Sequence, residues 1–106
     1  MLEHILIISA GDLPREPLED ALNRFARDIH DCPGLVSISW GRNVNPTGLQ
    51  RGCDYVCSAL LDSIDTLQTD YWNHPAHHVL LEELPALCAE RFALDFDVAE
   101  GETHGR

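Results

Sequence analysis

The chain has 106 residues, of which 44% are hydrophobic, so its length fits one domain and its composition is that of a globular protein. The 7 basic and 18 acidic residues give a formal net charge of −11, which repels nucleic-acid backbones and anionic membrane surfaces. We therefore expect neither a nucleic-acid partner nor membrane association.

The N-terminus lacks the basic region and long apolar run of a signal peptide, and no apolar run approaches the length that spans a bilayer. The four cysteines, at positions 32, 53, 57 and 88, show no CxxC spacing. We expect free, buried thiols in a cytoplasmic protein, with neither a disulfide framework nor a metal site.

The first half of the chain predicts a strand, a helix and a second strand. Residues 3–9 form a short β-branched run, which is typical of a strand. From 14 to about 31, apolar residues recur every three or four positions, and two early prolines suit the first turn of a helix. Residues 35–42 alternate, which predicts a strand with Val36 and Trp40 on the same face.

The second half predicts a strand, a broken helix and a last strand. Residues 54–61 are apolar on both faces, as in a covered strand. Helical spacing covers about 64–71 and again 75–89, with a proline at the break and a kink expected at Pro85. Residues 92–98 alternate between apolar and mostly acidic side chains, which predicts the fourth strand.

The resulting order β-α-β-β-α-β is that of the ferredoxin-like α+β fold, in which helices cover one face of a four-stranded antiparallel sheet. Strands 3–9 and 54–61 are apolar on both faces, so the second sheet face needs a cover as well, and a second copy of the chain is the economical one. We expect a single domain over 1–100, a homodimer through the sheet faces, and a flexible polar tail over 101–106.

Histidines gather where the second helical stretch begins. Spacing places His77 on the same face as Leu84, so its side chain is expected to point inward. Tyr71 at the end of the preceding short helix and His4 on the first strand are expected to face the same interior. His74 precedes a proline and is expected to cap the helix.

Segments spread over nearly the whole chain carry a resemblance to a known family. They are Glu3-His4-Ile5-Leu6, Pro33-Gly34-Leu35, Trp40-Gly41-Arg42-Asn43, Asp54-Tyr55, His74-Pro75-Ala76-His77 and Leu94-Asp95-Phe96. In these segments the sequence resembles the stress-responsive A/B barrel (Dabb) family of dimeric α+β barrel proteins. The resemblance implies that fold and a homodimer for this chain.

Within that family the chain is similar to plant olivetolic acid cyclase, which closes a linear polyketide by an intramolecular aldol condensation. The resemblance implies that His77 is the catalytic base, that Tyr71 is the hydrogen-bond donor, and that His4 is a further active-site histidine. His74 and Trp72 are expected to contact the substrate, and the implied chemistry needs no metal and no cofactor.

The hypothesis is thus a cofactor-free cyclase or related lyase that acts on a polyketide-like, carbonyl-rich small molecule. A neutral imidazole, with an ordinary pKa of ~6.5, suits proton abstraction between two carbonyls, and a phenol suits donation to the developing oxyanion. A non-catalytic, dimeric ligand-binding protein and a cofactor-free monooxygenase stay open as alternatives. An open pocket that contains Tyr71 and His77 favours an enzyme, whereas a filled interior argues against one.

Overall fold

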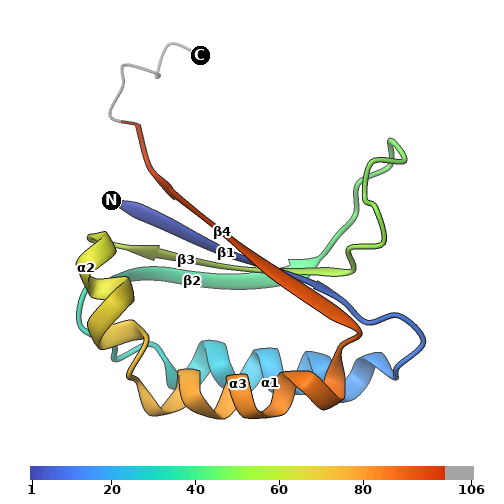
Figure 1. Cartoon of the computed structure of the whole chain (residues 1–106), viewed down its shortest axis with the longest axis horizontal. Coiled ribbons are helices and arrows are strands. Elements are labelled where there is room, and N and C mark those ends of the chain that lie inside the picture. Colours follow the sequence, from blue (N-terminus) through green and yellow to red (C-terminus); the bar gives the residue numbers. More distant parts are fainter. Residues whose placement is uncertain (100–106) are drawn as a thin grey trace.

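Residues 1–99, which the computed structural model describes, form one four-stranded sheet with helices packed on one side of it (Figure 1). In chain order the elements are β1 (Leu2–Ser9), α1 (Arg15–Asp28), β2 (Leu35–Arg42), β3 (Tyr55–Leu61), α2 (Ile64–Thr66), the π-helical turn η1 (Leu67–Tyr71), α3 (Pro75–Leu87) and β4 (Glu90–Asp97). The predicted tail at 101–106 lies outside the described residues.

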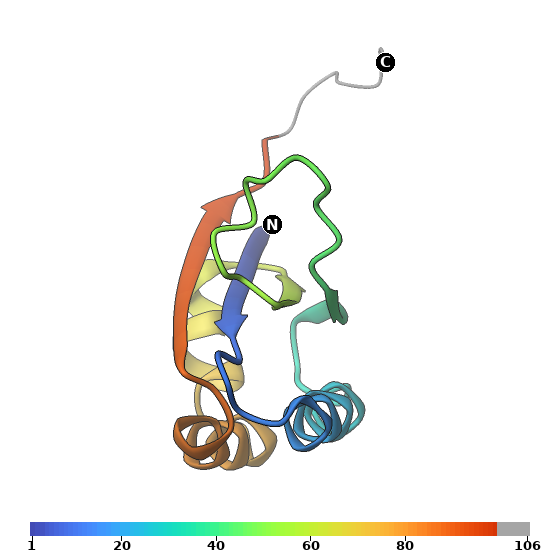
Figure 2. The same cartoon turned by 90° about the vertical axis from the view of Figure 1, so that its right-hand side faces the viewer.

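The sheet has the strand order β2-β3-β1-β4, and every neighbouring pair is antiparallel. The ferredoxin-like α+β fold predicted from the sequence is therefore confirmed. Figure 2 looks along the helices and shows α1 and α3 side by side beneath the sheet. Helix α1 begins directly after Pro14 and ends at Asp28, three residues before its predicted end.

The core lies between the sheet and the helices. Alternate side chains of β1 and β3 point to the helices, while α1 contributes an apolar stripe at helical spacing. The largest fully buried side chains are those of Ile8, Leu18, Leu22, Ile29, Tyr55, Leu61 and Leu84. Burial of this stripe fixes how α1 sits on the sheet.

One prediction for β2 was wrong. A bulge between Leu35 and Ser37 inserts one residue into the strand, so Val36 does not share the inner face with Trp40. Val36 is 51% exposed, whereas Leu35 and Ile38 pack against the core. Alternation does not predict the faces here, because a bulge places two residues of β2 opposite one residue of β3 and so reverses the alternation beyond it.

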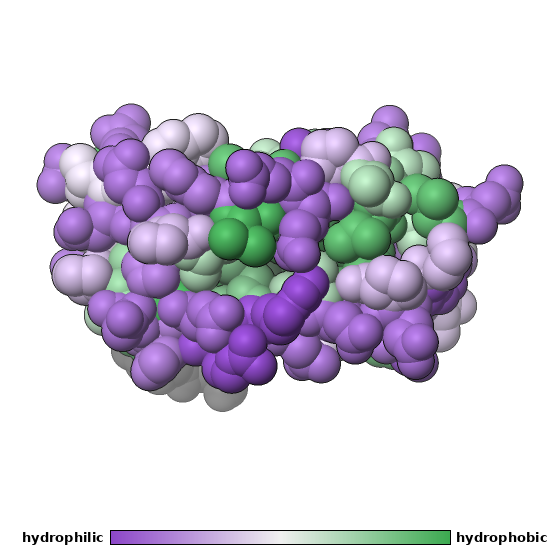
Figure 3. Space-filling model, turned by 90° about the horizontal axis from the view of Figure 1, so that it is seen from below, coloured by the Kyte–Doolittle hydropathy of each residue, from purple (hydrophilic) through white to green (hydrophobic). Residues whose placement is uncertain are grey.

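The sheet face opposite the helices is strongly apolar. Its partly buried members are Ile5, Ile7, Val56 and Leu60, and its half-exposed members are Phe92, Leu94 and Phe96. By contrast, the outer surface of the helices is mostly hydrophilic, with small separate apolar patches (Figure 3). A contiguous apolar face of this kind is typical of a surface that binds a partner.

The cysteines are free, as predicted. Cys32, Cys57 and Cys88 are buried, and Cys53 is partly buried. Within residues 1–99, none of the helices has both the length and the apolar character that a membrane crossing requires.

Candidate active site

A short irregular helix positions Tyr71. Ser63 caps helix α2, since its hydroxyl accepts a hydrogen bond from the backbone N–H of Thr66 at 3.2 Å. The helix then widens into η1, where the N–H of Trp72 donates to the carbonyl of Leu67, five residues earlier, at 3.2 Å. Such π-helical turns are rare and occur often at functional sites. The turn leaves Tyr71 only 3% exposed.

His74 supports the next helix. Its Nδ1 accepts a hydrogen bond from the N–H of Ala76 at 3.0 Å, which caps α3 as the sequence predicts. Its Nε2–H therefore donates to the carboxylate of Asp31 at 2.7 Å. Both ring nitrogens are engaged, and His74 lies apart from the cavity that the other candidate residues line.

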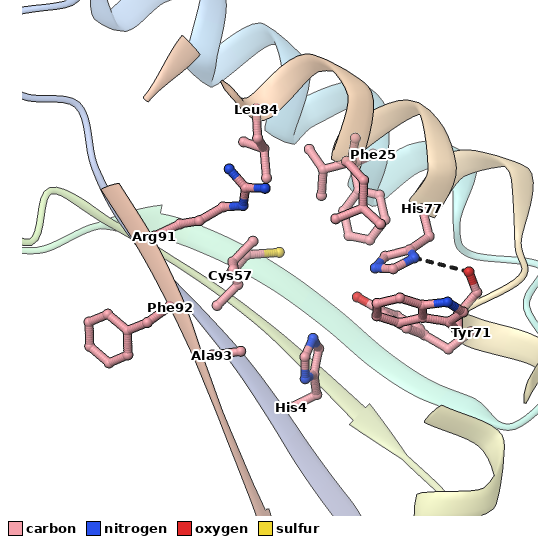
Figure 4. Close-up of a pocket in the computed structure, with 13 residues that line it drawn as sticks. His4, Phe25, Cys57, Tyr71, His77, Leu84, Arg91, Phe92 and Ala93 are labelled. Carbon is pink, nitrogen blue, oxygen red and sulfur yellow. Dashed lines mark hydrogen bonds between the residues drawn. The ribbon is translucent and has the colours of Figure 1, made fainter. Parts of the chain in front are cut away.

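A cavity of about 230 Å³ opens between the inner face of the sheet and α3 (Figure 4). Its lining is mostly apolar and includes His4, Tyr71, Trp72 and His77, so the structure brings together every predicted site residue except His74. The space exists because β4 presents the small Ala93 to the helices at this point. A second, more open hollow of about 440 Å³ shares His4, Trp72 and Ala93 with the cavity.

His77 is buried and has a defined tautomer. Its Nδ1 lies 3.1 Å from the carbonyl oxygen of Trp72, which can only accept, so Nδ1 carries the proton and Nε2 keeps a free lone pair. Burial lowers the pKa of His77 below its ordinary value, and the hydrogen bond to Trp72 only partly opposes this effect. His77 is therefore neutral at neutral pH and can accept a proton at Nε2.

Tyr71 lies next to His77 and keeps its proton. The two ring centroids are 5.2 Å apart, and the ring of Tyr71 also meets that of His4 edge-on at 5.4 Å. Burial raises the pKa of Tyr71 well above its ordinary value, so the phenol acts as a donor and not as a base. Its hydroxyl points into the cavity (Figure 4).

His4 is held by an acidic residue from the last strand. The register pairs His4 with Asp95, and His4 Nδ1 lies 2.5 Å from the Asp95 carboxylate. The carboxylate accepts, so Nδ1 is the donor, and Nε2 of the neutral ring is left as an acceptor. Asp95 thus fixes both the tautomer and the direction of the His4 ring.

Two lining residues and the partner of His4 were not found from the sequence. Arg91 on β4 and Cys57 on β3 line the cavity, while Asp95 on β4 lines the more open hollow and binds His4. The alternation of β4 could have placed Asp95 and Arg91 opposite its apolar residues, but only the strand register sets Asp95 against His4. Burial raises the pKa of Cys57 to about 12, so its thiol is protonated and is not a nucleophile at neutral pH.

Comparison with known proteins identifies the family. Residues 2–98 match the stress responsive A/B barrel domain, which is nearly the whole described chain. The chain belongs to this family. The family resemblance seen in the sequence is therefore confirmed, whereas the similarity to olivetolic acid cyclase stays a prediction. None of the curated proteins matches the chain.

Several solved structures superpose on the chain at low sequence identity. A dimeric ferredoxin-like protein from Thermobifida fusca has 21% identity and a TM-score of 0.77, covering 92% of this chain and 90% of that one. Hydroxynitrile lyase from Passiflora edulis has 14% identity and a TM-score of 0.79, with 94% of both chains covered. SnoaB, a cofactor-independent oxygenase from Streptomyces nogalater, has 16% identity and a TM-score of 0.74, with 96% of both covered. Identities this low show a shared fold alone.

The structure thus brings two histidines and a tyrosine together at one mostly apolar cavity. His77 presents a free Nε2, Tyr71 presents a protonated hydroxyl, and His4 is oriented by Asp95. Residues 1–99 contain no cluster of three or more His, Cys, Asp or Glu side chains that could hold a metal ion. The arrangement can move a proton and stabilise a developing oxyanion without further groups.

Proposed function

We propose that this protein is a cofactor-independent enzyme that makes or breaks a carbon–carbon bond in a small carbonyl compound. The specific reaction that we propose is the intramolecular aldol closure of a polyketide-like chain. The observation that carries the proposal is the adjacency of the neutral His77 and the protonated Tyr71 at an open cavity. An interior filled by side chains would have favoured a purely structural role for these two residues. The family also includes proteins without a known activity, so the site and not the fold carries the argument.

The proposed reaction begins with a proton transfer. His77 Nε2 removes a proton from a methylene group between two carbonyls, and the hydroxyl of Tyr71 donates a hydrogen bond to the enolate oxygen. The enolate carbon attacks a distant carbonyl carbon of the same molecule and forms the new carbon–carbon bond. The new alkoxide takes the proton back from His77, which regenerates the neutral imidazole. His4, oriented by Asp95, keeps Nε2 as an acceptor, which receives a hydrogen bond from an enol hydroxyl of the substrate.

Trp72 supports this chemistry by limiting access of water. Its ring centroid lies 4.9 Å from that of His77, while the residue itself is 53% exposed. It therefore covers His77 from the solvent side and is the lining residue best placed to contact the body of a substrate. Excluding water strengthens the hydrogen bond from Tyr71 to a developing charge.

The proposal is tested by turnover of linear poly-β-keto acids and their thioesters of increasing length. Ring closure is followed by mass spectrometry, and oxygen consumption is recorded in parallel. Cyclised product without oxygen uptake supports the aldol reaction. Oxygen uptake with a hydroquinone substrate would instead favour a cofactor-free monooxygenase, the second candidate, which the similarity in fold to SnoaB motivates. No turnover of either class would favour the ligand-binding alternative.

We further propose that the enzyme works as a homodimer through the open sheet face. Phe92, Leu94 and Phe96 on β4 are each about half exposed and share this face with Ile5 and Ile7. The similar Thermobifida fusca protein is described as dimeric, which supports the same arrangement here. A second copy would bury this face, and the removal of its apolar surface from water would stabilise the dimer.

Leu94→Asp is expected to convert the dimer into monomers, because it places a charge on the apolar face between Phe92 and Phe96. Light scattering coupled to size-exclusion chromatography measures the mass in solution. Val79→Asp is the matched control, since Val79 on α3 is 50% exposed, compared with 49% for Leu94, but lies on the helix layer. A monomeric wild type, or loss of the dimer in both variants, would contradict the proposed interface.

A further inference from the structure

The inner face of β4 is unusual for a strand that faces a core. The side chains that it turns toward the helices are those of Arg91, Ala93 and Asp95, which pair with Ile8, Leu6 and His4 of β1. An edge strand of a small domain normally places large apolar side chains at such positions. The small Ala93 between the two charged residues leaves the cavity open, and Arg91 gives the cavity one ionic group.

The two charged groups differ in their partners. Asp95 is bound to His4, as described above. Arg91 has no carboxylate partner among residues 1–99, although acidic residues outnumber basic ones by 18 to 7 in this chain. The other described arginines hold carboxylates, apart from Arg51 in an exposed loop: Arg15 with Asp54, Arg24 with Glu83, Arg27 with Asp28, and Arg42 with Glu19. The guanidinium of Arg91 is therefore free to bind a ligand.

The position of Arg91 fits such a ligand. Arg91 extends from β4 toward Leu84 on α3, while His77 and Tyr71 lie on the opposite side of the same cavity (Figure 4). The wall between them is apolar and includes Phe25 and Leu84. One end of the cavity thus offers a cation with a planar fork of donors, and the other end offers the proposed base and oxyanion donor.

We propose that Arg91 binds the carboxylate of the substrate, which makes the substrate a free keto acid and not a neutral ketone or a carrier-bound thioester. This proposal rests on the proposed function, in which the carbonyl end of the same substrate reacts at His77 and Tyr71. A guanidinium pairs with a carboxylate in a two-pronged geometry, which fixes both the position and the orientation of the ligand. With the carboxylate held at Arg91, the carbonyl end reaches toward His77 and Tyr71 along the apolar wall.

Because the protein has a large negative net charge, the binding of an anionic ligand depends on Arg91. At −11, the chain as a whole repels anions, so binding of a carboxylate requires a local cation. Arg91 is the one residue with a permanent positive charge among those that line the cavity. The volume of about 230 Å³ is below the range of ~300–1,000 Å³ of typical ligand pockets, which favours a small acid.

The test compares benzoate with benzamide, which have the same shape but differ in charge. Binding is measured from the NMR shift of the Trp72 indole N–H at about pH 8, well above the ordinary histidine pKa of ~6.5. Wild type is expected to bind benzoate about tenfold or more tightly than benzamide, and Arg91→Gln is expected to lose this preference. Arg51→Gln, which removes the same charge from the exposed loop between β2 and β3, is expected to keep it.

Equal affinity of the wild type for the two probes would overturn the proposal, as would a preference for benzoate that survives in Arg91→Gln. Inorganic phosphate that binds in an Arg91-dependent way while benzoate does not would also overturn it, because the cation would then serve a phosphate group. His77→Gln separates the two proposals. It is expected to keep the preference for benzoate, so failure of the proposed base and failure of the anion site give different results.

Discussion

Replacing His77 by glutamine is expected to lower kcat for ring closure about 10²–10⁴-fold, the range typical of a lost general base. Glutamine can still donate a hydrogen bond to the carbonyl of Trp72, as His77 Nδ1 does at 3.1 Å, but it has no basic nitrogen to place at the cavity. KM is expected to change much less than kcat, because the lost interaction belongs to the proton transfer. Turnover of the best poly-β-keto acid measures both constants.

The neighbouring histidine provides the control. His78 lies on the same turn of α3 but is exposed, so His78→Gln removes an imidazole without touching the cavity and is expected to leave kcat unchanged. Melting temperatures of both variants show whether the fold is kept. An equal loss of activity in the two variants, or a folded His77→Gln protein with full kcat, would exclude His77 as the base.

The pH profile of the wild type gives an independent readout. Burial lowers the pKa of His77, so the ring stays neutral below the ordinary histidine pKa of ~6.5. Activity that depends on neutral His77 is therefore expected to persist as the pH falls through that value and to be lost only below it. This acidic limb is expected to be absent from the residual activity of His77→Gln.

Much of the fold follows from the sequence because the strands and α1 have clear periods. The β2 range 35–42 agrees with the structure to the residue, and the start of α1 follows from the position of Pro14. The bulge at Val36 could not be found in this way, since one extra residue in a strand leaves the same alternating letters on each side of it. The open sheet face was also visible in advance, because β1 and β3 are apolar on both sides.

The candidate site was predictable only where local spacing sets the direction of a side chain. Helical spacing was sufficient for His77, because it lies in the first turns of a regular helix. Ile64 precedes Tyr71 by seven residues, a spacing that puts two side chains on one face of a regular α-helix, yet it is 47% exposed because the π-helical turn between them changes the rotation per residue. Asp95 and Arg91 depend on which residue of β1 each one faces, and that register is a property of the folded sheet.

Tyr71→Phe is expected to lower kcat about 10²–10³-fold, the usual cost of one lost oxyanion donor, without lowering the stability of the fold. The variant loses only the hydroxyl, which points into the cavity, so no group in the core is left unpaired. Its matched control is Tyr55→Phe. Tyr55 is equally buried, but its hydroxyl donates to the carboxylate of Glu19 at 2.5 Å, outside the cavity.

The two hydroxyls should therefore separate catalysis from stability. Tyr55→Phe is expected to reduce the melting temperature, because Glu19 loses a hydrogen bond that also lowers its pKa, while kcat stays at the wild-type value. Tyr71→Phe is expected to lower kcat and to keep the wild-type melting temperature. Thermal unfolding and turnover measured on the same preparations make the comparison direct. If Tyr71→Phe were instead destabilised and fully active, its hydroxyl would be a structural group, and the oxyanion donor would have to be another residue that lines the cavity.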